Sequence, residues 1–288
     1  MNNWRLVILS FFVSINSLCS QGLLDELSEE VTEQTYYTEA TFKDTRIVNL
    51  QSNETTDKNV LHFVILHRFG EITDGFYNLF GIDNAQMKMS FDYGITDDIS
   101  TSFARSNYQK TFEGSLKAKI LKQSTGFRKM PVSITIYSAC FYTNDTTGKY
   151  YNYTNLQRLS FVQQAIITKK INKNLSLALV PSLVHKNIIQ APYELHDNFI
   201  LGLGGRYKVS PRVSINAEYN LRLNLPEDDR YNNGLSLGCD IETGGHVFQL
   251  HVTNSKGMFE RSFLTENLGT WREGRLYFGF NLSRVFNL

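Results

Sequence analysis

The chain has 288 residues, and its 29 Lys and Arg against 28 Asp and Glu leave a formal net charge of +1. This near-neutral balance, without a basic run, excludes electrostatic tracking of a nucleic-acid backbone. Of three cysteines, Cys140 and Cys239 fall inside apolar alternations. That placement favours two small hydrophobic side chains over a disulfide.

Residues 1–20 predict a secretory signal peptide. Arg5 gives a weak positive start, 6–13 form an apolar core, and small residues at 16–20 favour cleavage between Ser20 and Gln21. A lipoprotein interpretation through Cys19 is weakened by the bulky Leu18 before it. No later stretch approaches the roughly 20 apolar residues of a membrane helix. The mature chain is therefore either a soluble secreted protein or a β-barrel.

Residues 21–59 precede the regular pattern. The stretch 21–36 is acidic, 41–50 has strand character without clean alternation, and 53–59 is a polar turn. We expect 21–59 to form a periplasmic arm or a lumen plug rather than a barrel strand.

A period of two dominates residues 60–288. It is clearest at 212–224, where Val213, Ile215 and Leu221 share one face and Glu218 and Arg222 the other. Thirteen alternating residues exceed the five or six of a usual soluble strand and suit a tilted membrane strand. The stretch 159–171 alternates poorly, so its lipid-facing side stays open. The predicted strands are 60–69, 87–95, 99–107, 112–120, 132–142, 159–171, 174–186, 199–209, 212–224, 234–241, 247–255 and 275–288.

Short and long connections alternate along these strands. Tight turns occupy 96–98, 172–174, 210–212 and 243–245, and longer loops occupy 70–84, 143–158, 187–196, 226–231 and 256–272. The connections 108–110 and 123–130 fit this alternation less well. Outer-membrane barrels combine short periplasmic turns with long outer loops and an even strand count. The sequence therefore predicts an all-β fold, a transmembrane antiparallel up-and-down barrel of twelve strands, in the bacterial outer membrane.

The last predicted strand carries its own signal. Phe278, Phe280, Phe286 and Leu288 share one parity close to the C-terminus. This pattern resembles the terminal signal that barrel-assembly machinery reads. We expect outer-membrane lipid and that machinery as partners, with a periplasmic partner for 21–59 as a further option.

Several blocks carry a family resemblance across 40–288. They are ATFKDTRIVN, LHFVILHRFG, the loop at 77–81 leading into FDYGITDDIS, SNYQKTFEGSLKAKIL and GHVFQLHVTNS. Together they resemble an uncharacterised family of bacterial outer-membrane β-barrels, defined as a domain of unknown function. The resemblance implies the fold and the location, and it implies no activity, because that family has no established site residues.

Charged and polar side chains on the non-lipid parity are the candidate lumen-lining residues. Their functional interpretation is a polar conduit or small-solute site, and the alternative is an interior salt-bridge network that fills a closed barrel. The candidates are His62, Arg68, Lys88, Asp92, Glu113, Lys117, Arg206, Glu218, Arg222, Asp240, His251 and Arg275.

Other chemistry is less well supported. His62 and His67 lie five apart on one strand, as do His246 and His251, so neither pair chelates a metal from one face. The cluster 194–197 resembles an outer-membrane protease site but lacks a second acidic pair. We expect neither a cofactor nor an enzyme. Tyrosines at 150, 151 and 153 suggest an aromatic girdle or an exposed contact surface.

Two functions compete on this basis. One is a narrow channel or transport-associated barrel for small polar solutes. The other is a closed structural or interaction barrel that docks a periplasmic or surface partner. Mixed signs among the inward residues build no strong field of one sign, and twelve strands lie between small filled barrels and open porins. The channel is the preferred prediction, because long polar faces with Arg, Lys, Glu and Asp on most strands cost more to pack dry than to keep wet.

Overall fold

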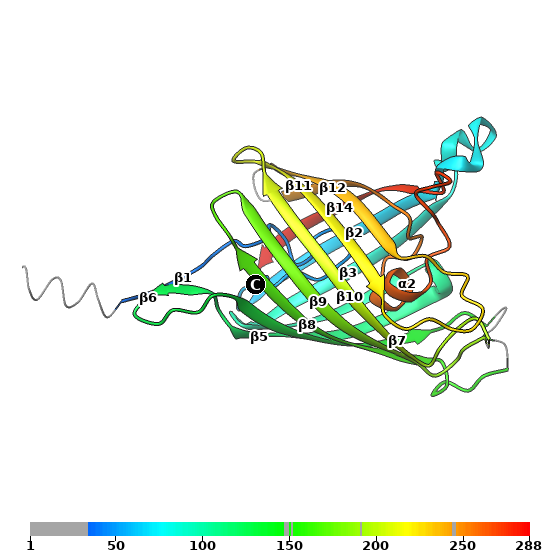
Figure 1. Ribbon diagram of the computed structural model, residues 1–288, viewed down its shortest axis with the longest axis horizontal. Coiled ribbons are helices and arrows are strands. Elements are labelled where there is room, and N and C mark those ends of the chain that lie inside the picture. The colour runs from blue at the N-terminus through cyan, green and yellow to red at the C-terminus, as the bar shows by residue number, and fades with distance from the viewer. Residues whose placement is uncertain (1–33, 147–149, 151, 191, 244–245) are drawn as a thin grey trace, which may run out of the picture.

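The protein is a closed β-barrel whose lumen holds other segments of the same chain (Figure 1). The computed structural model describes residues 34–146, 150, 152–190, 192–243 and 246–288. The predicted signal peptide and residues 21–33 lie outside this part. Twelve strands form the barrel, and they are β2 (Val60–Glu71), β3 (Ala85–Thr96), β4 (Ile99–Ser106), β5 (Thr111–Leu121), β7 (Ser133–Thr143), β8 (Leu159–Lys170), β9 (Leu175–Lys186), β10 (Asp197–Lys208), β11 (Val213–Arg222), β12 (Gly234–Thr243), β13 (His246–Thr253) and β14 (Tyr277–Asn287).

The barrel closes through its first and last strands. β14 pairs antiparallel with β2, with Leu282 opposite Ile65, and every other neighbouring pair is antiparallel too. Closure leaves no edge strand, which lipid demands because it cannot hydrogen-bond exposed backbone groups. The predicted all-β class, the strand count of twelve and the exclusion of 41–50 from the barrel are confirmed.

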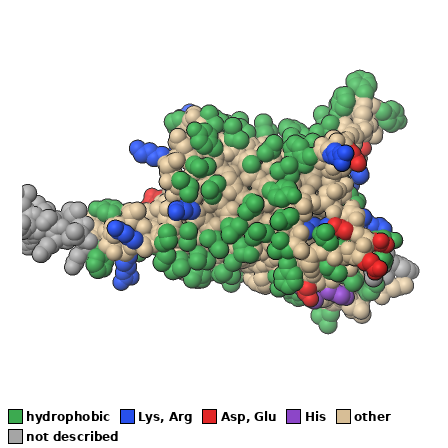
Figure 2. All heavy atoms as spheres, in the orientation of Figure 1, with side chains coloured by type: hydrophobic (Ala, Val, Ile, Leu, Met, Phe, Trp, Pro, Cys, Tyr) green, Lys and Arg blue, Asp and Glu red, His purple; other side chains and the backbone are tan. Residues whose placement is uncertain are grey.

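The outer face of the barrel is apolar. On β11, Ile215 and Leu221 are exposed, whereas Ser214, Asn216 and Glu218 of the opposite parity are buried. Figure 2 shows hydrophobic side chains over the visible wall and charged ones gathered towards its ends. This distribution suits a wall that faces lipid between two polar boundaries. None of the described helices is long and apolar enough to cross a membrane.

Most apolar side chains of the inner face lie on one half of the barrel, β7 to β10, where polar ones such as Gln164 and Ser182 lie among them, and the other half is mostly polar. On β7 to β10 the inward side chains include Phe141, Ile166 and Val180, which form one buried cluster with Phe42 and Phe263. Phe42 belongs to the chain before the barrel, and Phe263 to α2 (Glu260–Thr265), a short helix in the loop between β13 and β14. This explains the poor alternation at 159–171, because Val162 and Ile166 on the inward face of β8 pack on the apolar filling beside the buried polar Gln164 and Thr168, so that face is mixed.

The two connections of unexpected length also have structural reasons, where inner and outer name the two barrel ends by the orientation that the loop lengths predict. The long inner connection carries β6 (Ser124–Gly126), which pairs with β1 (Thr35–Tyr37) in a separate two-stranded sheet. The short outer connection forms a single 3-10 turn, Tyr108–Lys110, whose tyrosine ring lies 6.2 Å from that of Phe259. The outer hairpin between β2 and β3 contains two 3-10 segments, Ile72–Asp74 and Phe76–Gly81.

The stability of the packed lumen should be sensitive to side-chain volume on β10, because Ile47 of the chain before the barrel packs against that strand. A Cβ atom at Gly204 would collide with the side chain of Ile47, whereas one at Gly205 points outward and meets Leu177 at 3.6 Å. We expect Gly204→Val to lower the free energy of unfolding by about 1–3 kcal/mol, the usual cost of overpacking. Gly205→Val is the matched control, because it shares the gain in strand propensity. Urea unfolding in detergent, followed by circular dichroism, measures both. Equal stability of the two variants would contradict the packing of Ile47 against β10.

Candidate functional site

Residues 41–58, here named the inner segment, lie inside the barrel. Wall side chains donate hydrogen bonds to their backbone carbonyl oxygens. Lys117 of β5, Gln249 of β13 and Asn281 of β14 do so at 2.9, 2.6 and 3.3 Å. Because these strands lie on different sides of the barrel, the inner segment is held across the lumen. Buried backbone groups need such partners once water is excluded.

Glu218 of β11 holds the turn of the inner segment. Its carboxylate accepts hydrogen bonds from the backbone N–H groups of Val48, Asn49 and Leu50 at 2.9–3.2 Å. The Asn49 side-chain amide donates a further bond at 2.8 Å. A carboxylate has the acceptor sites for this many donors, and charge strengthens each bond. Glu218 is therefore the main polar attachment of the turn.

Residues 256–272, here named the outer loop, enter the lumen from the opposite end. All six residues of α2 are buried. Glu260 of this helix accepts from Arg46 Nη1 at 2.7 Å and from Gln51 Nε2 at 2.6 Å. The inner segment and the outer loop therefore meet in the interior of the barrel.

Two further cations support this meeting point. Arg68 of β2 is fully buried and donates to the carbonyl oxygens of Ser255 and Gly257 at 2.6 and 2.8 Å, and to Asn49 Oδ1 at 2.6 Å. It thus binds the start of the outer loop and the inner segment together. Lys88 of β3 donates to the Glu113 carboxylate at 2.5 Å.

Glu113 links this pair to the centre. Arg46 Nη2 lies 3.7 Å from Glu113 Oε1, and the Tyr137 hydroxyl donates to the same oxygen at 3.1 Å. Arg46 therefore lies between the carboxylates of Glu113 and Glu260. Buried charges persist when each has a partner of opposite sign and satisfied hydrogen bonds.

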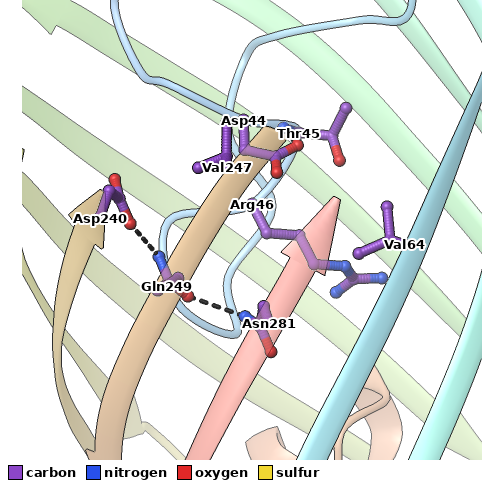
Figure 3. A pocket seen from close by; sticks show the side chains of 8 residues that line it. All are labelled: Asp44, Thr45, Arg46, Val64, Asp240, Val247, Gln249 and Asn281. Atoms are coloured by element: carbon purple, nitrogen blue, oxygen red, sulfur yellow. Dashed lines mark hydrogen bonds between the residues drawn. The ribbon is translucent and has the colours of Figure 1, made fainter. Parts of the chain in front are cut away.

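The centre of the barrel is nearly full. Figure 3 shows the cavity beside Arg46, where Gln249 donates to Asp240 at 2.6 Å and Asn281 donates to Gln249 at 2.7 Å. This cavity measures about 10 Å³ and a neighbouring one about 20 Å³, each room for about one water. Larger cavities, about 430 Å³ and 250 Å³, open at the inner and outer ends. The central residues separate these two mouths.

The structure places all but one of the predicted lumen-lining residues on barrel strands. Those with buried side chains are His62, Arg68, Lys88, Glu113, Lys117, Glu218, Arg222, Asp240 and His251. Asp92 and Arg206 are partly buried. Arg275 lies before β14, with its side chain 41% exposed, and pairs with Glu71 at 3.0 Å. It is apart from the others, because the last strand begins two residues later than predicted.

These residues do not form one site. His62, Arg68, Lys117 and Glu218 contact the inner segment, with His62 Nε2 3.4 Å from Asp44. Arg222 instead pairs with Asp229 of the 226–231 loop at 2.8 Å. Near the other end, Ser214 accepts from Arg206 at 3.0 Å and donates to Asp240 at 3.1 Å. The candidates are therefore spread along the barrel.

Sequence reasoning missed the residues at the centre. Arg46, Asn49, Gln51 and Glu260 lie in segments without strand periodicity, so parity assigned them no direction. The available signal was compositional, namely an apolar IVNL stretch in a segment that belongs to no barrel strand. Such a stretch needs a place to be buried, and the lumen supplies it.

The remaining candidates have structural roles. Within the described residues no group of three or more His, Cys, Asp or Glu is arranged to hold a metal. In the 194–197 cluster, the Glu194 carboxylate accepts from the Tyr231 hydroxyl at 2.9 Å and His196 Nδ1 contacts the Lys186 carbonyl at 2.6 Å. Tyr150 is buried and accepts from Arg261 at 2.6 Å, so it belongs to neither a girdle nor an exposed surface. Tyr151 lies outside the described residues.

The central charges shift one another's pKa. Burial alone lowers the pKa of Arg46, but Glu260 and Glu113 more than offset it and the net pKa is raised. Burial alone raises the pKa of Glu260, but Arg46 and then Lys88 reverse this, so its pKa is lowered. The pair is therefore charged at neutral pH. Since the folded pKa of Glu260 lies below the unfolded value, its contribution to stability is present above the unfolded pKa. It is lost as the pH falls through the folded pKa.

Removal of the central cation should destabilise the protein strongly. Arg46→Ala leaves the Glu260 carboxylate buried without its main counter-charge, and breaking a buried pair costs about 3–5 kcal/mol. Lys43→Ala is the control, because Lys43 pairs with Glu242 at 2.5 Å with side chains 28% and 38% exposed. Such exposed pairs contribute about 0–1 kcal/mol. Urea unfolding measures both variants, and equal losses would contradict the central role of Arg46.

Comparison with known proteins gives the chain a family. No curated protein matches it in sequence. The NanC porin has a TM-score of 0.51 at 8% identity, over 77% of this chain and 98% of that one. An outer membrane channel from Pseudomonas putida F1 has a TM-score of 0.50 at 12% identity, over 81% of this chain and 98% of that one. Outer membrane phospholipase A from Escherichia coli has a TM-score of 0.47 at 12% identity, over 83% of this chain and 96% of that one. The first two likenesses show the fold, that of a bacterial outer-membrane barrel. A family model described as "Membrane bound beta barrel domain (DUF5777)" matches residues 42–286, and the chain belongs to that family.

Proposed function

We propose that the protein is a gated, narrow channel for small polar solutes, closed in this conformation. The observation that carries the proposal is the meeting of the inner segment and the outer loop through Arg46 and Glu260. It leaves a cavity at each mouth and room for single waters between them. Displacing the inner segment and the outer loop together from the polar half of the wall joins the two mouths, because Glu260 loses its main counter-charge once Arg46 leaves it. In this view 60–288 is the channel and the inner segment is its plug.

The polar half of the wall is where the path opens. The inner segment contacts β11, β13 and β14 through hydrogen bonds from Glu218, Gln249 and Asn281. Water can replace such bonds, each of which contributes a net of about 0.5–1.5 kcal/mol. The apolar cluster on β7 to β10 has no such substitute, because its exposure to water costs free energy in proportion to area. We infer that the segment stays against β7 to β10 and leaves the polar half.

The charges along this path have both signs. The predicted lumen-lining residues include Arg68 and Lys117 as well as Glu218 and Asp240, and we propose that they line the open path. Mixed signs build no strong field of one sign, so weak ion selectivity is expected. We assign the protein no enzymatic activity, because the polar residues of the interior pair with one another rather than around a reactive group.

The last strand supports a role in assembly. On β14, Phe278, Phe280 and Phe286 share a parity, and the first and last are exposed on the outer wall. We propose that barrel-assembly machinery reads this strand, and that a periplasmic partner acts on the chain before the inner segment. Displacement of the plug by that partner would open the channel.

Weakening the attachment of the plug should raise channel opening. Glu218→Gln removes the charge and leaves one acceptor oxygen for the donors of Val48, Asn49 and Leu50, while its amide adds donors against them. We expect more frequent stepwise conductance in planar bilayers than in the unchanged protein. Glu227→Gln, in an exposed part of an outer connection, is the control and should leave the recordings unchanged.

A reversible cross-link tests the same gate from the other side. A Cβ atom at Gly238 of β12, on the polar half of the wall, comes within 3.0 Å of the Val48 side chain, so Val48→Cys with Gly238→Cys can form a disulfide in a background of Cys140→Ser and Cys239→Ser. We expect silence when oxidised and conductance when reduced. If the unchanged protein, Glu218→Gln and the reduced pair are all silent, the channel is contradicted and a closed structural barrel remains.

A further inference from the structure

The outer hairpin between β2 and β3 ends in an exposed apolar tip. Residues 75–82, here named the aromatic tip, carry no charge, and Asp74 and Asp83 flank them. Large side chains in the tip are unusually exposed, with Phe76 at 79% and Tyr77 at 95%. In Figure 1 the hairpin projects beyond the barrel end and away from its axis, and in Figure 2 its end is covered by hydrophobic atoms. A soluble surface rarely gathers such a patch without a partner.

The backbone holds this tip in place. Gly81 has a φ of 88° and approaches Gly70 so closely that a Cβ atom there would come within 2.5 Å of its carbonyl carbon. The Phe80 N–H donates to the Gly75 carbonyl at 2.8 Å, and the Phe76 and Phe80 rings pack edge to face at 6.3 Å. The exposed rings are therefore fixed on a closed turn.

The conformation of the tip also carries backbone strain. Leu79 and Phe80 adopt φ angles of 46° and 53°, in the left-handed region that bulky residues avoid. Both side chains nevertheless remain exposed, at 45% and 53%. Strain of this kind persists where an interaction repays it. The contact between the Phe76 and Phe80 rings offsets part of this strain, and burial of the exposed side chains against an external apolar surface would offset more.

The apolar surface of the tip continues that of the lipid-facing wall. At the same end of the barrel, Phe69 of β2 stacks on Phe278 of β14 at 5.9 Å, and Phe280 lies 6.4 Å from Phe69. The connection between β2 and β3 begins at Ile72, three residues after Phe69. The established lipid interface therefore leads to the base of the hairpin.

We propose that the aromatic tip inserts into the outer leaflet of the membrane beside the barrel. Its rings and the Tyr77 hydroxyl suit the boundary between acyl chains and head groups, where amphipathic aromatic side chains gather. The splay of the hairpin away from the barrel axis places it over lipid and not over the mouth. The flanking Asp74 and Asp83 stay at the polar side of this boundary. The tip thereby fixes the depth and tilt of the barrel on the side of β2 and β3.

Fluorescence quenching by lipid tests the insertion. Trp271 is the only tryptophan beyond the predicted signal peptide, so Trp271→Phe gives a silent background. Tyr77→Trp then reports on the tip, and Asp228→Trp, in the exposed part of another outer connection, is the matched control. Both proteins are reconstituted into vesicles of phosphatidylcholine with or without brominated acyl chains. We expect brominated lipid to reduce the emission at position 77 by about twofold or more, as for an interfacial ring, and to leave position 228 unchanged.

Acrylamide in the aqueous phase gives the complementary readout. A tryptophan at 77 should be protected from it relative to one at 228. If the emission of the tryptophan at 77 is unchanged by brominated lipid but is quenched by acrylamide, the proposal is overturned. That result would point to a protein partner for the tip. Phe80→Trp repeats the measurement at a second position, so that poor folding of one variant does not decide the result.

Discussion

The closed interior depends on one buried contact, the pair between Arg46 and Glu260 at 2.7 Å. Its two members arrive from opposite ends of the barrel, one on the inner segment and one on the outer loop. Neither charge is stable there alone, because removing a charge from water without a partner costs several kcal/mol. The two segments therefore enter the lumen as a unit, and Glu113, Gln51 and Lys88 complete the set of partners.

The division of the wall into an apolar and a polar half gives the inner segment its orientation. Phe42, Ile47 and Leu50 pack on β7 to β10, so the opposite edge of the segment faces β11 to β14 and β2. On that edge Glu218 supplies an acceptor for three backbone N–H groups in succession. Hydrophobic packing, which has no preferred direction, and hydrogen bonding to Glu218, which has one, thus act on opposite faces of the same turn. The first tolerates sliding, whereas the second fixes the register.

The outside of the barrel follows a simpler constraint. Lipid offers no hydrogen bonds, so the wall has to close and its outward side chains have to be apolar. This requirement ends at the rim, where polar loops take over. The aromatic tip is the exception beyond the rim, because this part of a connection is apolar like the outer face of the barrel wall. Its large side chains are exposed although it carries no charge between Asp74 and Asp83.

Sequence alone determined the barrel, because the alternation of side chains across a strand has a period of two whatever the neighbours are. It therefore gave the strand count, the outward face and the inward direction of residues such as Glu218 and Arg222. It left the side of β8 open, since apolar Val162 and Ile166 lie on the inward face of that strand while polar Gln163 and Lys169 lie on its outward face. Only the tertiary structure decided what occupies the lumen. Arg46 and Glu260 are 214 residues apart in the chain and lie in segments without a period, so no local pattern encodes their contact.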